Sequence, residues 1–275
     1  MIDFVPDGFF SVVMTVFGLL LGSFGNVVIW RFPRGESVVS PGSHCPACDA
    51  PVRWYDNLPV VSWFVLHGRC RECAEPISTR YPLVETASGV LWVTAALAFG
   101  PTPQSLVAAI FFWTLLVLSM IDLDTMRLPN PIIAALALFG LTSVLFSQFA
   151  GVHAAPLTTA TDSPLLDAAL GVLLGGGVSG GVAGLYALIR GRSGFGMGDV
   201  KLLGAMGLFL GPYVLLALMI GSMVGAVYGI ASAARSGSGL SAKIPFGPFL
   251  ALGGIATALA GPELVDWYLS LVGLV

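Results

Sequence analysis

The run QSLVAAIFFWTLLVLSMID, residues 104–122, contains no charged side chain before its final aspartate. A helix that crosses a bilayer needs about 20 predominantly apolar residues, and this run is long enough. A carboxylate at membrane depth is costly and by default marks a functional site. The run therefore predicts a membrane helix and singles out Asp122 at its end.

Similar runs recur along most of the chain. Of its 275 residues, 56% are hydrophobic and only 10% are charged, whereas soluble domains carry about 25% charged residues. The first run is too long for a cleaved signal peptide, and further runs follow it. The sequence thus predicts an all-α polytopic membrane protein with about eight transmembrane helices. The candidate spans are 8–30, 83–100, 104–122, 131–149, 165–190, 199–211, 214–234 and 247–265.

The charges predict how these spans are oriented. If the chain crosses eight times, all 12 Lys and Arg residues fall in segments on one side. The other side carries only acidic residues, namely Asp3, Asp7, Asp162, Asp167, Glu263 and Asp266. Because basic loops stay in the cytoplasm, we expect both termini outside and the large loop, residues 31–82, inside.

This loop contains all four cysteines, as Cys45-Pro-Ala-Cys48 and Cys70-Arg-Glu-Cys73, with 21 residues between the pairs. Two residues between cysteines let both thiolates reach one ion, and two such turns complete a closed tetrahedral zinc site. A reducing compartment argues against disulfides. We predict a structural zinc that holds together a loop too small to fold alone. A redox or iron–sulfur role is the alternative.

Two histidines, His44 and His67, lie beside the cysteine pairs. They are either polar loop residues or exchangeable metal ligands.

A second acid begins the sixth span. Asp199 lies in GMGDVKLL, residues 196–203, after glycines that permit close backbone approach. Span three ends at the membrane boundary from which span six departs, so Asp122 and Asp199 are expected at one depth although 77 positions apart. Two adjacent carboxyl groups keep one proton between them. The carboxylate can then activate water while the protonated neighbour polarises a peptide carbonyl.

This pair predicts peptide hydrolysis, with an ion or proton relay as the alternative. Asp124 could take the place of Asp122. It lies nearer water and about 200° around the helix, so a capping or loop contact is the expected role.

Seven blocks in register resemble the type IV prepilin peptidases, bifunctional leader peptidase/N-methyltransferases of type IV pilus and type II secretion systems. Besides the cysteine pairs, the blocks are GSFGNVVIWRFP (22–33), DNLPVVSW (56–63), RYPLVE (80–85), IDLDTMRLPN (121–130), GMGDVKLL (196–203) and IPFGPFLALGG (244–254). The resemblance implies a GxGD-type intramembrane aspartic protease with Asp122 and Asp199 as catalytic pair. The sequence departs mildly from the family pattern at Asn130, where an acid is common.

The resemblance also implies a substrate, a cofactor and a location. Such an enzyme lies among the lipids of the bacterial inner membrane and cuts the basic leader from prepilins or pseudopilins at the cytoplasmic face. It then methylates the new α-amino group with S-adenosylmethionine, and no nucleic acid is expected as a partner. The chain would divide into a first transmembrane helix (1–30), a zinc-binding loop (31–82) and a protease core (83–275). The retained cysteine loop favours the bifunctional form.

The methyl-transfer site is the least readable part, because no glycine-rich nucleotide loop follows a strand. The family implicates the N-terminal region, which suggests Asn26 and Arg31 as cofactor contacts. The alternatives are an interhelical hydrogen bond for Asn26 and an interface anchor for Arg31. Two other function classes stay open: a proton- or ion-coupled transporter that uses the acid pair, and a membrane-anchored zinc-ribbon adaptor.

Overall fold

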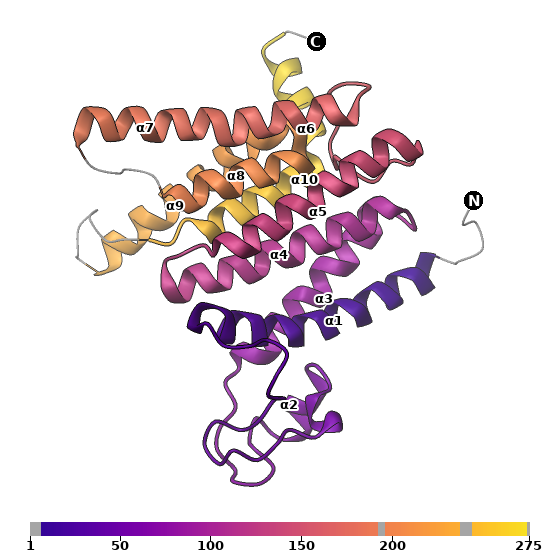
Figure 1. Cartoon of the computed structure of the whole chain (residues 1–275), viewed down its shortest axis with the longest axis vertical. Helices are drawn as coiled ribbons and strands as arrows, with labels where there is room; N and C mark the ends of the chain where they lie inside the picture. Colours follow the sequence, from indigo (N-terminus) through magenta and orange to yellow (C-terminus); the bar gives the residue numbers. More distant parts are fainter. Residues whose placement is uncertain (1–6, 192–195, 237–243, 274–275) are drawn as a thin grey trace. The chain divides into compact units, whose positions relative to one another are not determined.

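The fold is helical, as a computed structural model of the chain shows (Figure 1). The structure describes residues 7–191, 196–236 and 244–273, and in these ranges the only β pairing is two isolated bridges. The chain forms two compact units, residues 1–101 and 102–275, which we describe separately. Three charged residues of the predicted topology, Asp3, Arg192 and Lys243, lie outside the described residues.

In the first unit, two long helices pack closely against each other. Helix α1 (Asp7–Arg31) and helix α3 (Arg80–Phe99) meet at Gly18 and Gly22, where a Cβ would lie 2.6 Å from Trp92 and 2.7 Å from the backbone of Glu85. Small residues four positions apart are a common way for membrane helices to approach, because lipid supplies no hydrophobic drive between them. The hydroxyl of Ser88 also donates to the Gly18 carbonyl at 2.5 Å.

The segment between α1 and α3 contains little regular structure. Its described elements are the 3₁₀ turns η1 (Phe32–Arg34) and η2 (Trp54–Asn57) and the short helix α2 (Val61–Val65). The indole of Trp63 donates to the Ile77 carbonyl at 3.0 Å, and its ring lies against Gly68. This residue therefore fixes α2 to the second cysteine pair.

The second unit consists of longer helices. In chain order they are α4 (Pro103–Thr125), α5 (Asn130–Ala150), α6 (Pro164–Val172), the π-helical stretch η3 (Leu173–Val178), α7 (Ser179–Arg190), α8 (Met197–Leu210), the turn η4 (Gly211–Tyr213), α9 (Val214–Ser236) and α10 (Gly247–Leu271). Helices α6, η3 and α7 follow one another without a break. They match the predicted span 165–190.

Helix α8 is the centre of this unit. Its side chains Leu202, Leu203, Met206 and Phe209 are all almost fully buried. Gly207 lies in backbone contact with Gly171 of α6, so no side chain fits between these two helices. On the other side, the ring of Phe209 stacks on the ring of a phenylalanine in α4, Phe111, with centroids 4.5 Å apart. The position of Asp199, at the start of α8, is thereby set by packing over the whole helix.

The number of crossings is the point at which sequence and structure differ. The sequence predicts eight spans, and within the described residues seven stretches are long and apolar enough to cross a membrane. One of these, Met197–Arg235, comprises α8 and α9 with a reversal between them, since Met206 and Ala217 both contact neighbouring glycines of α10, Gly254 and Gly253. Helix α8 alone has 14 residues, or about 21 Å, which is shorter than a full crossing.

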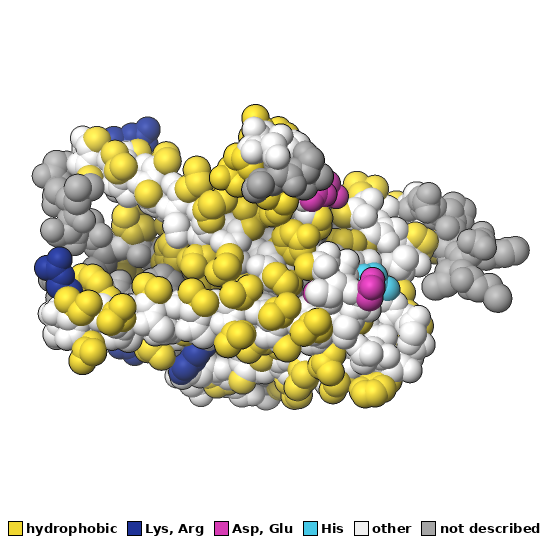
Figure 2. All heavy atoms as spheres, turned by 90° about the horizontal axis from the view of Figure 1, so that it is seen from above, with side chains coloured by type: hydrophobic (Ala, Val, Ile, Leu, Met, Phe, Trp, Pro, Cys, Tyr) yellow, Lys and Arg dark blue, Asp and Glu magenta, His cyan; other side chains and the backbone are white. Residues whose placement is uncertain are grey.

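Apolar side chains cover much of the surface in Figure 2. Such a surface suits helices surrounded by lipid, and the predicted class, an all-helical polytopic membrane protein, is confirmed. The sidedness of the termini and the division into residues 1–30, 31–82 and 83–275 stay predictions. Helix α3 belongs to the same compact unit as α1.

Candidate active site and metal centre

Asp122 is a buried carboxyl group near the end of α4. Its Oδ2 accepts a hydrogen bond from the backbone N–H of Gly247, the first residue of α10, at 2.8 Å. A Cβ at position 247 would lie 2.8 Å from the same oxygen, so a larger residue there would push the Asp122 side chain away. The residue that follows α4, Met126, adopts a left-handed conformation with φ of 52° and turns the chain away.

Asp199 lies in the first turn of α8 and is half-buried. The N-terminus of a helix carries partial positive charge, which favours a carboxylate at this place. Gly196, the residue before the helix, would bring a Cβ to 2.6 Å from the Asp199 carboxylate. The sequence predicts that the glycines before Asp199 allow another group to come close, and at Gly196 the group that comes close is the Asp199 carboxylate.

The segments next to the two carboxyl groups share a neighbour. The side chain of Leu128 contacts Gly198, which precedes Asp199, and also Gly247, which binds Asp122. Their common depth in the membrane and their catalytic role stay predictions.

The residues around the pair have other partners. Asp124 is exposed, two positions beyond Asp122. Lys201 of α8 donates to the side-chain oxygen of Asn130 at 2.9 Å, which joins the start of α8 to the start of α5. Asn130 is the position where the sequence departs from the family pattern, and an amide oxygen serves there as acceptor.

The two cysteine pairs form turns of the same construction. In the first, Cys45 N–H donates to the Ala50 carbonyl at 2.9 Å, and in the second Cys70 N–H donates to the Glu75 carbonyl at 2.8 Å. Each turn closes with an isolated bridge, His44 with Pro51 and Arg69 with Pro76. Both also contain a residue in the left-handed region, Asp49 and Ala74, with φ of 55° and 58°. We call these two turns the knuckles.

The knuckles bring four sulfur atoms together. The ligand atoms of Cys45, Cys48, Cys70 and Cys73 all lie within 4.8 Å of one another, and no other described residue belongs to the group. The sulfurs of Cys45 and Cys73 are 3.8 Å apart. A tetrahedral zinc with Zn–S bonds of about 2.3 Å requires sulfur atoms about 3.8 Å apart, whereas a disulfide requires about 2.05 Å. The residues present fit zinc, and His44 and His67 are not among the ligands.

The ionisation of these thiols also fits a cation. The backbone N–H of Cys73, and then that of Glu72, lowers the pKa of the Cys70 thiol to about 7. The Glu75 N–H acts in the same direction on Cys73, but the neighbouring Cys48, desolvation and the other thiols outweigh it and raise the pKa of Cys73 to about 12. A positive ion bound between the cysteines would favour the thiolate form of both Cys70 and Cys73.

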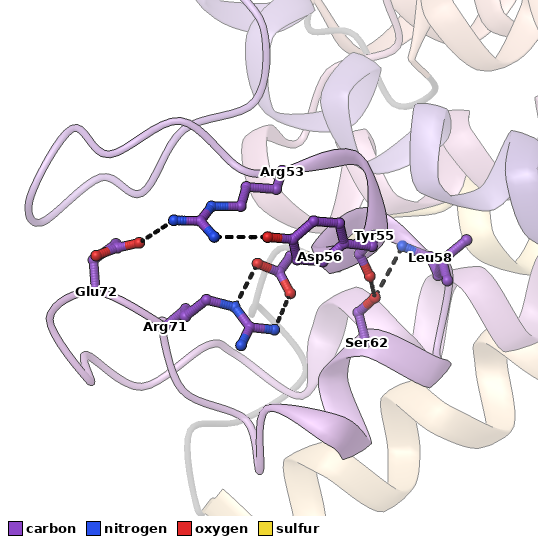
Figure 3. A network of polar contacts seen from close by, with 7 residues as sticks. All are labelled: Arg53, Tyr55, Asp56, Leu58, Ser62, Arg71 and Glu72. Carbon is purple, nitrogen blue, oxygen red and sulfur yellow. Dashed lines mark hydrogen bonds and ion pairs between the residues drawn. The ribbon is translucent and has the colours of Figure 1, made fainter.

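A polar network joins the knuckles to each other (Figure 3). Arg71 makes a two-pronged contact with Asp56, from Nε at 2.8 Å and from Nη2 at 2.5 Å. This hydrogen-bonded partner lowers the pKa of the Asp56 carboxyl below its usual value. Arg53 donates to the Tyr55 hydroxyl at 2.7 Å and to Glu72 at 3.2 Å. The network links residues that follow the first knuckle to residues inside the second.

A cavity of about 300 Å³ opens beside this network, lined by Cys48, Ala50, Pro51, Arg53, Glu72 and Cys73. Its size is at the lower end of the range for ligand pockets.

The two residues predicted for the cofactor have partners inside the protein. Asn26 donates from Nδ2 to the Tyr81 carbonyl at 3.1 Å, an interhelical bond between α1 and α3. Arg31 donates to three carbonyls of the loop, those of Ser37, Pro41 and Gly42. The bond of Asn26 is the interhelical hydrogen bond that the sequence offered as its alternative role. The role of Asn26 and Arg31 in methyl transfer stays a prediction.

Sequence reasoning missed two residues near these sites. Gly247 was recognised as part of a motif, but nothing in the motif indicates that its N–H binds Asp122. Glu85 is buried in α3, and its Oε2 accepts from the backbone N–H of Val60 at 2.7 Å. The sequence could have indicated Glu85 through its place inside an apolar span, because a carboxyl group there requires a partner.

Two family profiles match the chain in the same order as its two units. The Bacterial Peptidase A24 N-terminal domain matches residues 16–99, and the Type IV leader peptidase family matches residues 109–230. No solved structure matches significantly.

Curated relatives match over nearly the full length. A prepilin leader peptidase/N-methyltransferase of Aeromonas salmonicida is 36% identical over 98% of this chain and 96% of its own. One of Pseudomonas putida is 34% identical over 98% and 97%. A type 4 prepilin-like proteins leader peptide-processing enzyme of Escherichia coli is 36% identical over 90% and 92%. The chain thus belongs to the type IV leader peptidase family, as a multi-pass inner-membrane member that retains the N-terminal A24 domain.

Proposed function

We propose that the chain cleaves the leader from prepilins and related pseudopilins with Asp122 and Asp199, and then N-methylates the new terminus. The observation that carries the proposal is that Leu128 packs against Gly198, next to Asp199, and also against Gly247, whose N–H binds Asp122. Relatives that cover both chains almost completely are named for both activities. Nothing among these relatives supports a transporter.

The pair can perform hydrolysis without a covalent intermediate. One carboxylate takes a proton from water as its oxygen attacks the carbonyl carbon, and the protonated partner donates a hydrogen bond to the carbonyl oxygen. The tetrahedral intermediate then breaks its C–N bond as a proton passes to the departing nitrogen. The bond from Gly247 N–H holds one Asp122 oxygen in place during these steps.

The position of the pair suits a substrate that crosses the membrane boundary. Both acids lie close to a helix end, Asp122 near the end of α4 and Asp199 at the start of α8. A prepilin with a basic leader before a hydrophobic helix would present its scissile bond at this level. We place this boundary at the cytoplasmic face, where basic segments stay.

The metal and the methyl donor have separate roles in this proposal. The four cysteines would hold zinc in a closed site with no open coordination position, so the ion is structural. S-adenosylmethionine, which the N-methyltransferase relatives imply, would supply the methyl group. The acceptor of that methyl group is the amine that hydrolysis creates on the cleaved substrate.

The test is cleavage of a prepilin-like peptide by the purified protein in detergent. Asp122→Asn and Asp199→Asn each replace an ionisable group with a neutral one of the same shape. Loss of one general acid or base typically costs about 10²- to 10⁴-fold in rate. We expect at least that loss from each variant, with the protein still in the membrane fraction.

Asp124→Asn is the matched control, because it removes a carboxyl group two positions away that is exposed. It should cleave at close to the normal rate. Near-normal cleavage by Asp199→Asn would sink the aspartic mechanism.

A further inference from the structure

Helix α2 exposes an apolar face. Leu58, Val61, Phe64 and Val65 are 44%, 57%, 64% and 62% exposed, respectively, and we call these four residues the α2 patch. The intervening residues face inward, since Ser62 is buried and the Trp63 indole is bonded to the Ile77 carbonyl. The segment 57–68 contains no Lys, Arg, Asp or Glu. A continuous apolar face of this kind calls for a covering surface.

A partly buried hydrogen bond sets the depth of this patch. Val60, the residue before α2, donates its backbone N–H to Glu85 Oε2 at 2.7 Å. Glu85 lies five residues into α3, which begins at Arg80, and therefore about 7.5 Å along the helix axis. Since α3 is one of the stretches that can cross the membrane, Val60 lies beside the spanning helix rather than beyond its end.

The backbone is bent to reach this position. Val60 has φ of 62° and ψ of −51°, and Val61 N–H donates to the Pro59 carbonyl at 2.6 Å. This is the γ-turn with positive φ, which is rare and strained, and a β-branched residue makes it costlier. Strain of this kind persists only where surrounding contacts hold it. The Glu85 carboxyl group is such a contact, and it ties α2 to the helix pair α1–α3.

We propose that the α2 patch is inserted into the lipid bilayer at the interface where α1 ends and α3 begins. Amphipathic segments at this depth bury their apolar face about 5–10 Å into the boundary between head groups and acyl chains. Exposed tryptophans, such as Trp54 beside α2 and Trp30 at the end of α1, are typical of the same layer. The zinc-binding loop is thus held by a lipid contact of its own, in addition to its two covalent ends.

The test uses the full-length protein in vesicles of phosphatidylethanolamine and phosphatidylglycerol. A photo-reactive benzoylphenylalanine replaces Phe64 in one variant and Ala47, an exposed residue of the first knuckle, in another. After irradiation, mass spectrometry identifies what each position has labelled. We expect predominantly lipid adducts from position 64 and severalfold fewer from position 47.

Other adducts would overturn the proposal. If position 64 labels residues 102–275, a second copy of the chain or an added prepilin peptide instead of lipid, the patch is covered by protein. Equal lipid labelling from positions 47 and 64 would also contradict it, because it would show no preferred depth. Zinc content is measured in both variants, and the aromatic replacement at Phe64 keeps an apolar ring there so that the loop still folds.

A second measurement does not depend on the photo-reactive group. In vesicles, Phe64→Asn should increase amide hydrogen exchange in residues 58–66 severalfold, because the polar side chain weakens the lipid contact. Val39→Asn is the matched control, at a loop residue outside the α2 patch that is 86% exposed, and it should leave this exchange unchanged. Unchanged exchange in Phe64→Asn, with zinc retained, would argue against a lipid contact.

Discussion

The hydrogen bond between Gly247 N–H and Asp122 depends on the absence of a side chain at position 247. The glycine supplies both the donor and the space, since a Cβ would meet the accepting oxygen at 2.8 Å. A substitution at position 247 can therefore displace the Asp122 carboxyl group without changing Asp122 itself. The residue is thus a positioning residue for Asp122.

We predict that Gly247→Ala lowers the rate of cleavage while the protein remains folded. The methyl group pushes the Asp122 side chain away, and a displacement of about 1 Å in a catalytic group can cost about 10²-fold. The measurement is the cleavage rate of a prepilin peptide at saturating concentration, together with the thermal midpoint in detergent. Gly184→Ala is the control, because a Cβ there meets nothing within 4 Å. Equal rates for the two variants would contradict the prediction.

At the scale of elements, α8 depends on backbone contact with α6. Gly171 and Gly207 touch so closely that an added Cβ on either would meet the backbone of the other. Such contacts fix the position of α8 along α6 and, with it, the position of Asp199.

Gly207→Ala should therefore reduce stability, since overpacking of an interior contact costs about 1–3 kcal/mol. The expected result is a lower thermal midpoint in detergent and slower cleavage. Gly181→Ala, in α7 where a Cβ meets no atom within 4 Å, is the matched substitution. An unchanged midpoint for Gly207→Ala would mean that the two helices can separate freely.

The knuckles form an element of a different kind, because we expect metal rather than packing to hold them. Purified protein should contain one zinc, and Cys48→Ser should lower its content and increase proteolysis within residues 31–82, since an incomplete thiolate set binds zinc poorly. Elemental analysis and limited proteolysis measure the two effects. Cleavage of prepilin should persist, because the acid pair lies outside the loop. A folded, protease-resistant loop without metal would refute the assignment.

Local rules explain which features the sequence predicts well. Apolar length identifies the helices, and the CxxC spacing alone indicates that Cys45, Cys48, Cys70 and Cys73 meet. The carboxyl of Glu85 could be recognised as unusual, but its partner could not, because Val60 reaches it through a γ-turn that no propensity indicates. The bond from Gly247 to Asp122 joins residues 125 positions apart. Contacts of that kind depend on packing that composition and periodicity do not specify.

For the whole molecule, the proposed activities separate into two regions of sequence. The acids lie in α4 and α8, whereas the cysteine loop and the end of α1 belong to the first unit. We expect Asp199→Asn to stop methylation of an uncut prepilin, since the acceptor amine does not yet exist. The same variant should methylate a pilin that has been cut beforehand.

The readout is transfer of a labelled methyl group from S-adenosylmethionine to each substrate. Cys48→Ser should show the opposite pattern, with cleavage kept and methylation reduced. If Asp199→Asn fails on the pre-cut pilin while it still folds and binds S-adenosylmethionine, the two activities share one site.

The hydrogen bond from Asn26 to the Tyr81 carbonyl, at 3.1 Å, has a consequence for the architecture of related chains. It shows that the two ends of the long loop leave and re-enter the α1–α3 pair side by side. A short connection could join those ends without moving either helix, because the cost of closing a flexible loop changes only slowly with its length. A chain that lost the cysteine-bearing segment in one deletion could therefore keep the two helices together, but it would also have to replace Glu85, whose partner Val60 would be lost with the segment.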